Sequence, residues 1–242
     1  MDLGLWTLDL YWLSRKLDDV PNGDDWLSSA ERAVATGKEF SKRRDDWILG
    51  RWTAKQAVCA YLAIPSDLPS LASIEIRAAP DGAPESFLQD QRLPVSLAIS
   101  HSAGTSFCAV GPPDFAVGCD LEQIRPLVDN FVEDYFVAQE AARLQNLSPE
   151  DREAVTLLIW SAKESSLKSL REGLRRDTRS VVVSFDRSQA GTDWNPLLVR
   201  CTITARAFHG WWQIAAGYVR TITAAYPTPQ PIEIHLPQEN KK

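Results

Sequence analysis

Two acidic side chains alternate with apolar ones in the segment Phe115-Ala116-Val117-Gly118-Cys119-Asp120-Leu121-Glu122. Alternation with a period of two is typical of a β-strand, and it directs Asp120 and Glu122 to one face, roughly 7 Å apart. Two carboxylates at that separation could share a hard cation such as Mg²⁺, although an acidic solvent face would show the same pattern. The small residues Ala116 and Gly118 on this face would leave room for a ligand.

A second group of charged residues lies in the segment 160–171, which reads W-S-A-K-E-S-S-L-K-S-L-R. At about 100° per residue, the apolar stripe of a helix here consists of Trp160, Leu167, Leu170 and Leu174. Lys163 falls inside this stripe, so its side chain must either extend to solvent or meet an anion. Glu164 and Lys168 lie four residues apart beside the stripe. An ordinary surface ion pair explains Glu164 with Lys168, but it explains Lys163 poorly.

Further polar residues occur in the first half of the chain. Ser100 and His101 end an apolar strand and begin a tight turn, where a scaffold commonly presents functional side chains. Arg44, Arg51 and Lys55 are spaced i, i+7 and i+11, which places them on one face of a helix. Such a basic face is either solvated or able to hold the phosphates of a polyanionic ligand.

Taken in order, these motifs resemble those of the Sfp-type 4′-phosphopantetheinyl transferases. That family has a serine-histidine pair, a G-x-D-x-E strand and a W-[ST]-x-K-E-x-x-x-K helix, and the resemblance extends from about residue 42 to residue 219. It implies that Mg²⁺ would be held by Asp120, Glu122 and Glu164. It also implies that the phosphates of coenzyme A would be held by Ser100, His101 and Lys163, with Lys168 facing the pyrophosphate. The basic helix of Arg44, Arg51 and Lys55 would lie near the 3′-phosphate and adenine.

The reaction implied by this resemblance moves the phosphopantetheine arm of coenzyme A onto a serine of an apo acyl or peptidyl carrier protein, as in a holo-acyl-carrier-protein synthase. The products are the holo carrier and 3′,5′-ADP. Glu164 and Lys168 would act in catalysis, with Glu164 as the base. One departure stands out, because many relatives have Gly-Lys-Pro where this chain has Gly82-Ala83-Pro84. A cationic contact to coenzyme A is then missing or is supplied by another residue.

Two other functions fit some of the same residues. A Mg²⁺-dependent phosphoesterase would use the three carboxylates to activate water instead of serine. A non-catalytic module would bind coenzyme A or a carrier protein without needing every carboxylate and lysine. The sequence does not indicate which carrier is served, whether from fatty acid, polyketide, nonribosomal peptide or lysine metabolism.

The elements that must position these residues recur in two halves. The first half is predicted to contain a strand at Leu3–Leu10, helices from Ser28 and over Lys42–Leu62, and strands at Ser73–Ala79, Leu93–Ser100 and Ser106–Val110. The second is predicted to contain a strand at Phe115–Glu122, helical sequence over Val128–Arg171, and strands at Ser180–Asp186, Leu198–Phe208 and Trp211–Val219. We therefore predict an α+β, pseudo-twofold duplicated fold, with a small mainly antiparallel sheet packed on helices in each half. The expected boundaries are 1–112, 113–225 and a Pro-rich extended tail at 226–242.

The composition limits the class of protein. The 242 residues are 44% hydrophobic and 24% charged, values typical of a folded globular protein, and the net charge of −6 argues against a general nucleic-acid binder. No segment reads as a signal peptide or a membrane span. The four cysteines have no C-x-x-C spacing, which indicates reduced thiols rather than a zinc site. These features favour a cytoplasmic monomer that binds no nucleic acid and no membrane.

Overall fold

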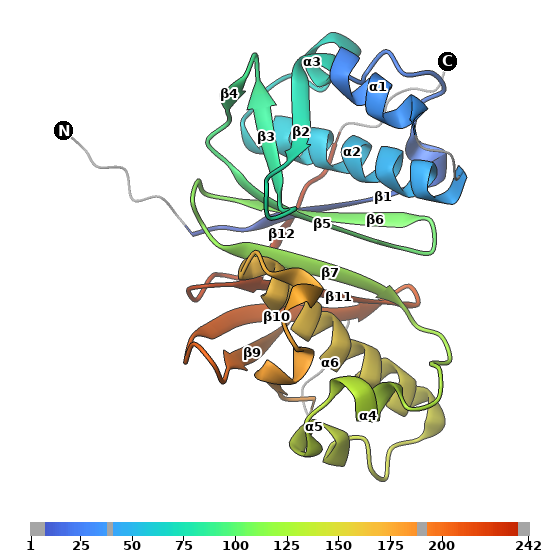
Figure 1. The fold of residues 1–242 in the computed structure, drawn as a ribbon, viewed down its shortest axis with the longest axis vertical. Coiled ribbons are helices and arrows are strands. Elements are labelled where there is room, and N and C mark those ends of the chain that lie inside the picture. Colours follow the sequence, from blue (N-terminus) through green and yellow to red (C-terminus); the bar gives the residue numbers. More distant parts are fainter. Residues whose placement is uncertain (1–7, 38–40, 188–192, 237–242) are drawn as a thin grey trace, which may run out of the picture.

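The computed structural model describes residues 8–37, 41–187 and 193–236, which form two α+β halves stacked on one another (Figure 1). In each half one long helix packs against the outer face of a main sheet, and the two main sheets face each other in the middle. The architecture is α+β with mainly antiparallel sheets, as predicted. None of the helices in the described residues is both long enough and apolar enough to cross a membrane.

The first half surrounds the long helix α2. Its elements are β1 (Tyr11–Lys16), α1 (Ser29–Thr36), α2 (Ser41–Tyr61), α3 (Leu68–Ser73), β2 (Ile74–Ala78), β3 (Pro84–Leu88), β4 (Gln91–Arg92), β5 (Ser96–Ser102) and β6 (Thr105–Gly111). The main sheet has the order β12-β1-β6-β5, and β2, β3 and β4 form a separate small sheet. Helix α1 begins as expected at Ser28, whose side chain accepts a hydrogen bond from the Glu31 N–H.

The second half surrounds the long helix α6. Its elements are β7 (Val117–Gln123), α4 (Phe131–Tyr135), α5 (Ala138–Ala142), α6 (Pro149–Ser169), β8 (Val181–Phe185), β9 (Asn195–Cys201), β10 (Ala207–Ala215) and β11 (Tyr218–Ala224). These strands form one antiparallel sheet in the order β7-β11-β10-β9-β8. Helix α6 covers β7 and β11 on the face away from the first half.

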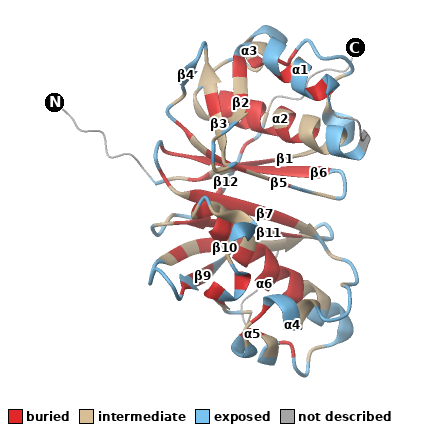
Figure 2. Cartoon of the chain, in the orientation of Figure 1, coloured by how far each residue is buried: buried red, intermediate tan, exposed pale blue. Residues whose placement is uncertain are grey.

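A shared apolar core joins the two halves. Side chains from β1, β5, β6, β7 and β11 pack together in it, among them Phe107 and Cys119. Strand β6 is buried on both faces, because Phe107 and Ala109 face the second half while Cys108 and Val110 face the α2 side. The buried residues accordingly concentrate on the strands in the middle of the molecule and on the long helices (Figure 2). The two halves therefore form one continuous packed unit.

Several predicted elements need correction. Of the strand predicted at Leu3–Leu10, residues 3–7 lie outside the described residues and 8–10 form no strand, so the first strand is β1 at Tyr11–Lys16. Two strands were predicted at Leu198–Phe208 and Trp211–Val219, but the structure has three, β9, β10 and β11. The first prediction spans a turn at residues 202–206, which separates β9 from β10. The small sheet strands β3 and β4 were not predicted. All four cysteines are buried, free thiols, as expected.

The Pro-rich C-terminal segment is not a free tail over its described part. Ile232–Glu233 forms β12, which pairs in parallel with Tyr11 and Trp12 of β1. Ile234 is buried in the core of the first half. The described part of this segment therefore leads from the second half back to the first, where β12 forms the edge of the sheet.

Candidate active site

Asp120 and Glu122 lie on the face of β7 that α6 covers. The Lys168 ammonium is 2.7 Å from Asp120 Oδ1, and the Trp160 indole N–H donates to Glu122 Oε1 at 2.9 Å. Both carboxylates thus point to one side of the strand, as the period-two pattern predicts. The room expected above Gly118 is not free. A Cβ at this position would lie 1.9 Å from the Ser165 carbonyl oxygen, so glycine here permits the close approach of α6.

Strand β5 supplies hydroxyl groups to the same two carboxylates. The Ser100 hydroxyl donates to Asp120 Oδ1 at 2.8 Å, and the Ser102 hydroxyl donates to Glu122 Oε2 at 3.5 Å. The Gln123 N–H in turn donates to Ser102 Oγ at 3.1 Å. Strands β5 and β7 belong to different halves and lie side by side. The carboxylates are therefore held where the two halves meet.

Lys168, near the end of α6, joins these groups. Its ammonium donates to Asp120 Oδ1 at 2.7 Å, to Ser100 Oγ at 3.1 Å and to the Cys119 carbonyl at 3.1 Å. Glu164, one turn earlier, has its Oε2 at 3.6 Å from the same ammonium. Burial opposes the charge on Lys168, but the neighbouring Asp120 and Glu164 carboxylates outweigh it and raise the pKa of this lysine.

The carboxylates carry more negative charge than Lys168 neutralises. Burial first, and then the charge of Asp120, raise the pKa of Glu122 to about 7 and that of Glu164 to about 8. Asp120 Oδ2 is buried and has no hydrogen-bond partner. In donor type and excess charge these three residues fit a hard divalent cation. As they stand, however, no three or more His, Cys, Asp or Glu side chains in the described part of the chain are arranged around a metal position.

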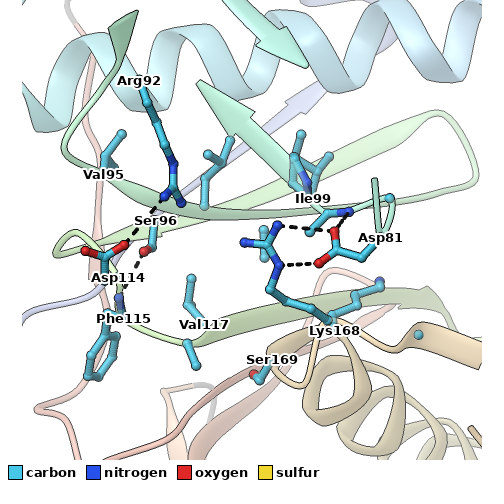
Figure 3. A pocket seen from close by; sticks show the side chains of 18 of the residues that line it. Asp81, Arg92, Val95, Ser96, Ile99, Asp114, Phe115, Val117, Lys168 and Ser169 are labelled. Carbon is cyan, nitrogen blue, oxygen red and sulfur yellow. Dashed lines mark hydrogen bonds and ion pairs between the residues drawn. The ribbon is translucent and has the colours of Figure 1, made fainter. Parts of the chain in front are cut away.

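A cavity of about 490 Å³ lies between the halves next to these groups. Its walls come from the turn at residues 81–84, from β5, from the start of β7, and from the end of α6 with the 3₁₀ turn Gly173–Arg175. In Figure 3, Asp81 of the first half and Lys168 of the second border the same cavity. Lys168 also contacts Asp120, so this lysine connects the cavity to the carboxylates.

Lys163 does not lie in this site, which corrects its predicted phosphate contact. Its side chain is 0% exposed, and its ammonium is 2.7 Å from Glu140 Oε2. It also donates to the carbonyls of Thr178 at 2.9 Å and Val181 at 2.6 Å. A buried ammonium is stable only where it is paired and hydrogen-bonded, and these partners satisfy all three of its N–H groups. The anion that Lys163 requires is therefore a glutamate of its own half.

Lys55 of the basic helix needs the same correction. Its ammonium is 2.5 Å from Glu31 Oε2 and donates to the carbonyls of Trp26 at 3.0 Å and Leu71 at 2.9 Å. Its side chain is likewise fully buried. The predicted contact with coenzyme A is not open to it, because the α2 face that carries Lys55 is turned into the core of the first half.

The surroundings of these two lysines repeat in detail. Glu31 and Glu140 each occupy the third position of a short helix, α1 or α5, and each accepts the N–H of the residue before that helix. The other oxygen of each glutamate accepts a strand N–H, from Ile76 of β2 or Val183 of β8. An aromatic ring lies beside each ammonium, Trp26 at 5.5 Å or Phe136 at 5.7 Å. Such repetition is expected of the duplicated fold that the order of elements predicts.

The structure does not bring the remaining predicted residues to the carboxylates. His101 follows Ser100 on β5 and its side chain is half exposed, 3.8 Å from Asp46 of α2. Arg44 is exposed on α2. Arg51 is partly buried, with its guanidinium 4.4 Å from the Trp47 ring centre, and burial lowers its pKa. Their contacts with a nucleotide stay predictions.

Sequence reasoning did not identify two residues that contact the carboxylates. Trp160 was assigned to an apolar stripe and to the family motif but to no contact with a carboxylate, yet its N–H donates to Glu122 while its ring packs against Phe131 and Tyr135. Ser102 lies two positions after Ser100, and this strand spacing was the available signal for it.

Comparison with known proteins agrees with this arrangement. Residues 116–221, which include β7 and α6, match the 4′-phosphopantetheinyl transferase superfamily. The chain is also 26% identical over 179 residues to the 4′-phosphopantetheinyl transferase HetI of Nostoc sp. strain PCC 7120, covering 72% of this chain and 71% of that protein. The segment that carries the carboxylates and Lys168 is therefore similar to the 4′-phosphopantetheinyl transferase superfamily, and this similarity supports a function in the modification of carrier proteins.

Proposed function

We propose that this protein is a Sfp-type, Mg²⁺-dependent transferase that uses coenzyme A to convert apo acyl or peptidyl carrier proteins to their holo forms. The observation that carries the proposal is the convergence of Asp120, Glu122 and Glu164 with Lys168 beside a cavity between the halves. Three ionised carboxylates with one ammonium leave a net negative charge, which a divalent cation would balance.

Asp120, Glu122 and Glu164 are the residues that would hold Mg²⁺. Asp120 Oδ2 is the buried acceptor still lacking a partner, and hydrogen bonds from Ser100 and Trp160 orient the carboxylates of Asp120 and Glu122. When bound, the cation would supply positive charge to the pyrophosphate of the donor.

Lys168 would stabilise the negative charge that grows on the pyrophosphate oxygens during transfer. Its side chain is 29% exposed and lines the cavity, so its ammonium can contact a phosphate while remaining near Asp120. The raised pKa keeps this ammonium protonated at neutral pH. Its charge is therefore available throughout the pH range in which an enzyme of this kind works.

Glu164 would act as the base for the incoming serine. In the transfer, the serine oxygen bonds to the β-phosphorus of coenzyme A, the bond from that phosphorus to 3′,5′-ADP breaks, and the serine proton passes to Glu164. Glu164 lies one turn before Lys168, and in its ionised form its carboxylate can accept this proton. The side chain is 19% exposed, which leaves an approach for the serine hydroxyl.

The other predicted donor contacts lie on the first half. His101 and Arg44 are accessible for a phosphate, whereas the buried Lys55 and Lys163 are not. We expect a monomer, because both walls of the cavity come from one chain. We also propose a cytoplasmic location.

Incubation with coenzyme A, Mg²⁺ and a panel of apo carrier proteins tests the proposal by intact mass. We expect one phosphopantetheine to be added to at least one carrier, and we expect the Asp120→Asn variant to lose this transfer. Free phosphopantetheine formed without a carrier would instead mean hydrolysis. Omission of Mg²⁺ in the presence of EDTA should abolish transfer, and unchanged transfer would refute the metal assignment.

A further inference from the structure

Helix α6 ends in a conformation that normally favours glycine. The Arg171 N–H donates to the Lys168 carbonyl at 2.9 Å and the Glu172 N–H donates to the Leu167 carbonyl at 3.1 Å, the paired bonds of a Schellman motif. Arg171 occupies the left-handed position of this motif, with φ of 58°. A side chain there carries a steric penalty that glycine avoids. The local backbone therefore gives no reason for an arginine at this position.

The Arg171 side chain reaches the other half of the molecule. Its Nε and Nη2 donate to the two oxygens of Asp81 at 2.6 and 3.2 Å, and Nη2 donates to Glu85 Oε1 at 2.9 Å. Asp81 lies in the turn between β2 and β3, and Glu85 lies on β3. These bonds join residues that are 90 and 86 positions apart in the sequence. The hydrogen bonds from Arg171 hold the pKa of Asp81 down, at about 2.

Arg175 strengthens the connection without an ion pair of its own. Its Nη1 donates to the Asp81 carbonyl at 2.9 Å and its Nη2 donates to the Arg171 carbonyl at 2.7 Å. Among the described residues it has no carboxylate within salt-bridge distance, whereas Arg171 has two. Its positive charge is therefore less neutralised than that of Arg171, and it borders the cavity that Lys168 also borders.

We propose that Arg171 is a positioning residue for the donor: it fastens the Asp81 turn of the first half to the end of α6 and so fixes the width of the cavity. The turn, Arg175 and Lys168 all line this cavity, and Lys168 leads from it to the carboxylates. With the turn fastened, Arg175 and Lys168 present two cations to a phosphate-bearing ligand at a fixed separation. This role rests on the proposed use of coenzyme A as donor.

The Arg171→Gly variant separates this role from that of a helix end. Glycine suits the left-handed backbone but removes both ion pairs, which are partly exposed and contribute little to stability. We expect a melting temperature within a few degrees of wild type, a KM for coenzyme A raised about tenfold and a kcat changed by less than about threefold. Arg171→Lys, which keeps the charge but not the two-pronged geometry, should restore part of the affinity.

Two further variants complete the design. Asp81→Asn loosens the same contact from the opposite half and should raise KM in the same way. In the double variant, Asp81→Asn should raise the KM for coenzyme A little beyond the value of Arg171→Gly alone, because both changes break the same connection. Arg187→Ala is the control, since Arg187 forms a 2.6 Å ion pair with Asp151 that is partly exposed and does not line the cavity. It should leave KM unchanged.

Calorimetric titration of coenzyme A into each protein, without a carrier, distinguishes failure of this inference from failure of the proposed function. If wild type binds coenzyme A and Arg171→Gly binds it equally well, Arg171 merely ends the helix and the inference is wrong. If wild type itself does not bind coenzyme A, the proposed donor is wrong. Should Arg171→Gly fail to fold, Asp81→Asn alone decides, and an unchanged affinity in that variant also overturns the inference.

Discussion

Replacing Lys163 by methionine should destabilise the protein strongly without a specific effect on the donor. Methionine has a similar length but no charge, so Glu140 would stay buried with only the N–H groups of Val137 and Val183 as partners. Removing one member of a buried ion pair costs about 3–5 kcal/mol. At roughly 2–4 °C per kcal/mol for a chain of this size, the melting temperature should fall by about 6–20 °C.

The duplicated fold offers a matched control in Lys55→Met. This change breaks the equivalent ion pair with Glu31 in the first half, in a fully buried setting of the same kind. We expect similar losses of stability in the two variants. At a temperature where both are folded, their affinities for coenzyme A should agree within about threefold. Adding Glu140→Gln to Lys163→Met should recover part of the stability, because the amide oxygen still accepts a backbone N–H but carries no charge.

Thermal unfolding and calorimetric titration with coenzyme A would check this reasoning. A phosphate contact made by Lys163 would contribute about 1.5–3 kcal/mol, or roughly ten- to hundredfold in affinity. A loss of that size in Lys163→Met, with stability close to wild type and no such loss in Lys55→Met, would refute our interpretation. It would show that this lysine leaves its buried position to bind the donor.

Three other predictions follow from the site. Glu164→Gln should lower kcat by about 10² to 10⁴ in steady-state assays, while its affinity for coenzyme A stays within several-fold of wild type. If kcat and the affinity for coenzyme A fall in proportion, Glu164 is only a metal ligand. The pKa values of Glu122 and Glu164 in the folded protein are raised from 4.5 to about 7 and about 8, so the folded state holds these two protons more tightly than the unfolded state does. The contribution of the two protonated carboxyl groups to the free energy of unfolding is therefore complete below about pH 4.5 and is lost as the pH rises through 7 to 8. Melting temperatures in EDTA should therefore fall between pH 5 and 8.5, less steeply with Mg²⁺, and a rise over this interval would contradict the assignment. Gly118→Ala should push α6 away from β7, because the added Cβ would lie 1.9 Å from the Ser165 carbonyl oxygen. We expect the free energy of unfolding, measured with denaturant, to fall by about 1–3 kcal/mol and the rate of transfer to fall further. A variant as stable as wild type would show that α6 does not approach β7 this closely.

The sequence could predict those parts of the site that depend on local periodicity. Asp120 and Glu122 share a face because a strand has a period of two, and Glu164 and Lys168 share a side because a helix places residues four apart together. It could not predict which long-range partner each charge meets. Ser102 and Trp160 contact Glu122 only because β5 and α6 both pack on β7. Predicted helix ends were also imprecise, since α6 stops at Ser169 where the Schellman bonds form, not at Arg171.

The two lysines of the W-S-x-K-E-x-x-x-K segment show why a motif need not mean a common task. Lys163 and Lys168 are five positions apart, about 500° around a helix, so they point in different directions. Lys163 turns toward Glu140 and the strand β8, where it makes the same contacts that Lys55 makes with Glu31 in the first half. The corresponding contacts in both halves are best explained by packing, because only one half carries the carboxylates. Lys168 turns instead toward β7 and the first half, and its partners Ser100 and Asp120 exist together only where the halves meet. The ion pair that repeats therefore positions the helix, and the lysine contact at the junction is the one suited to chemistry.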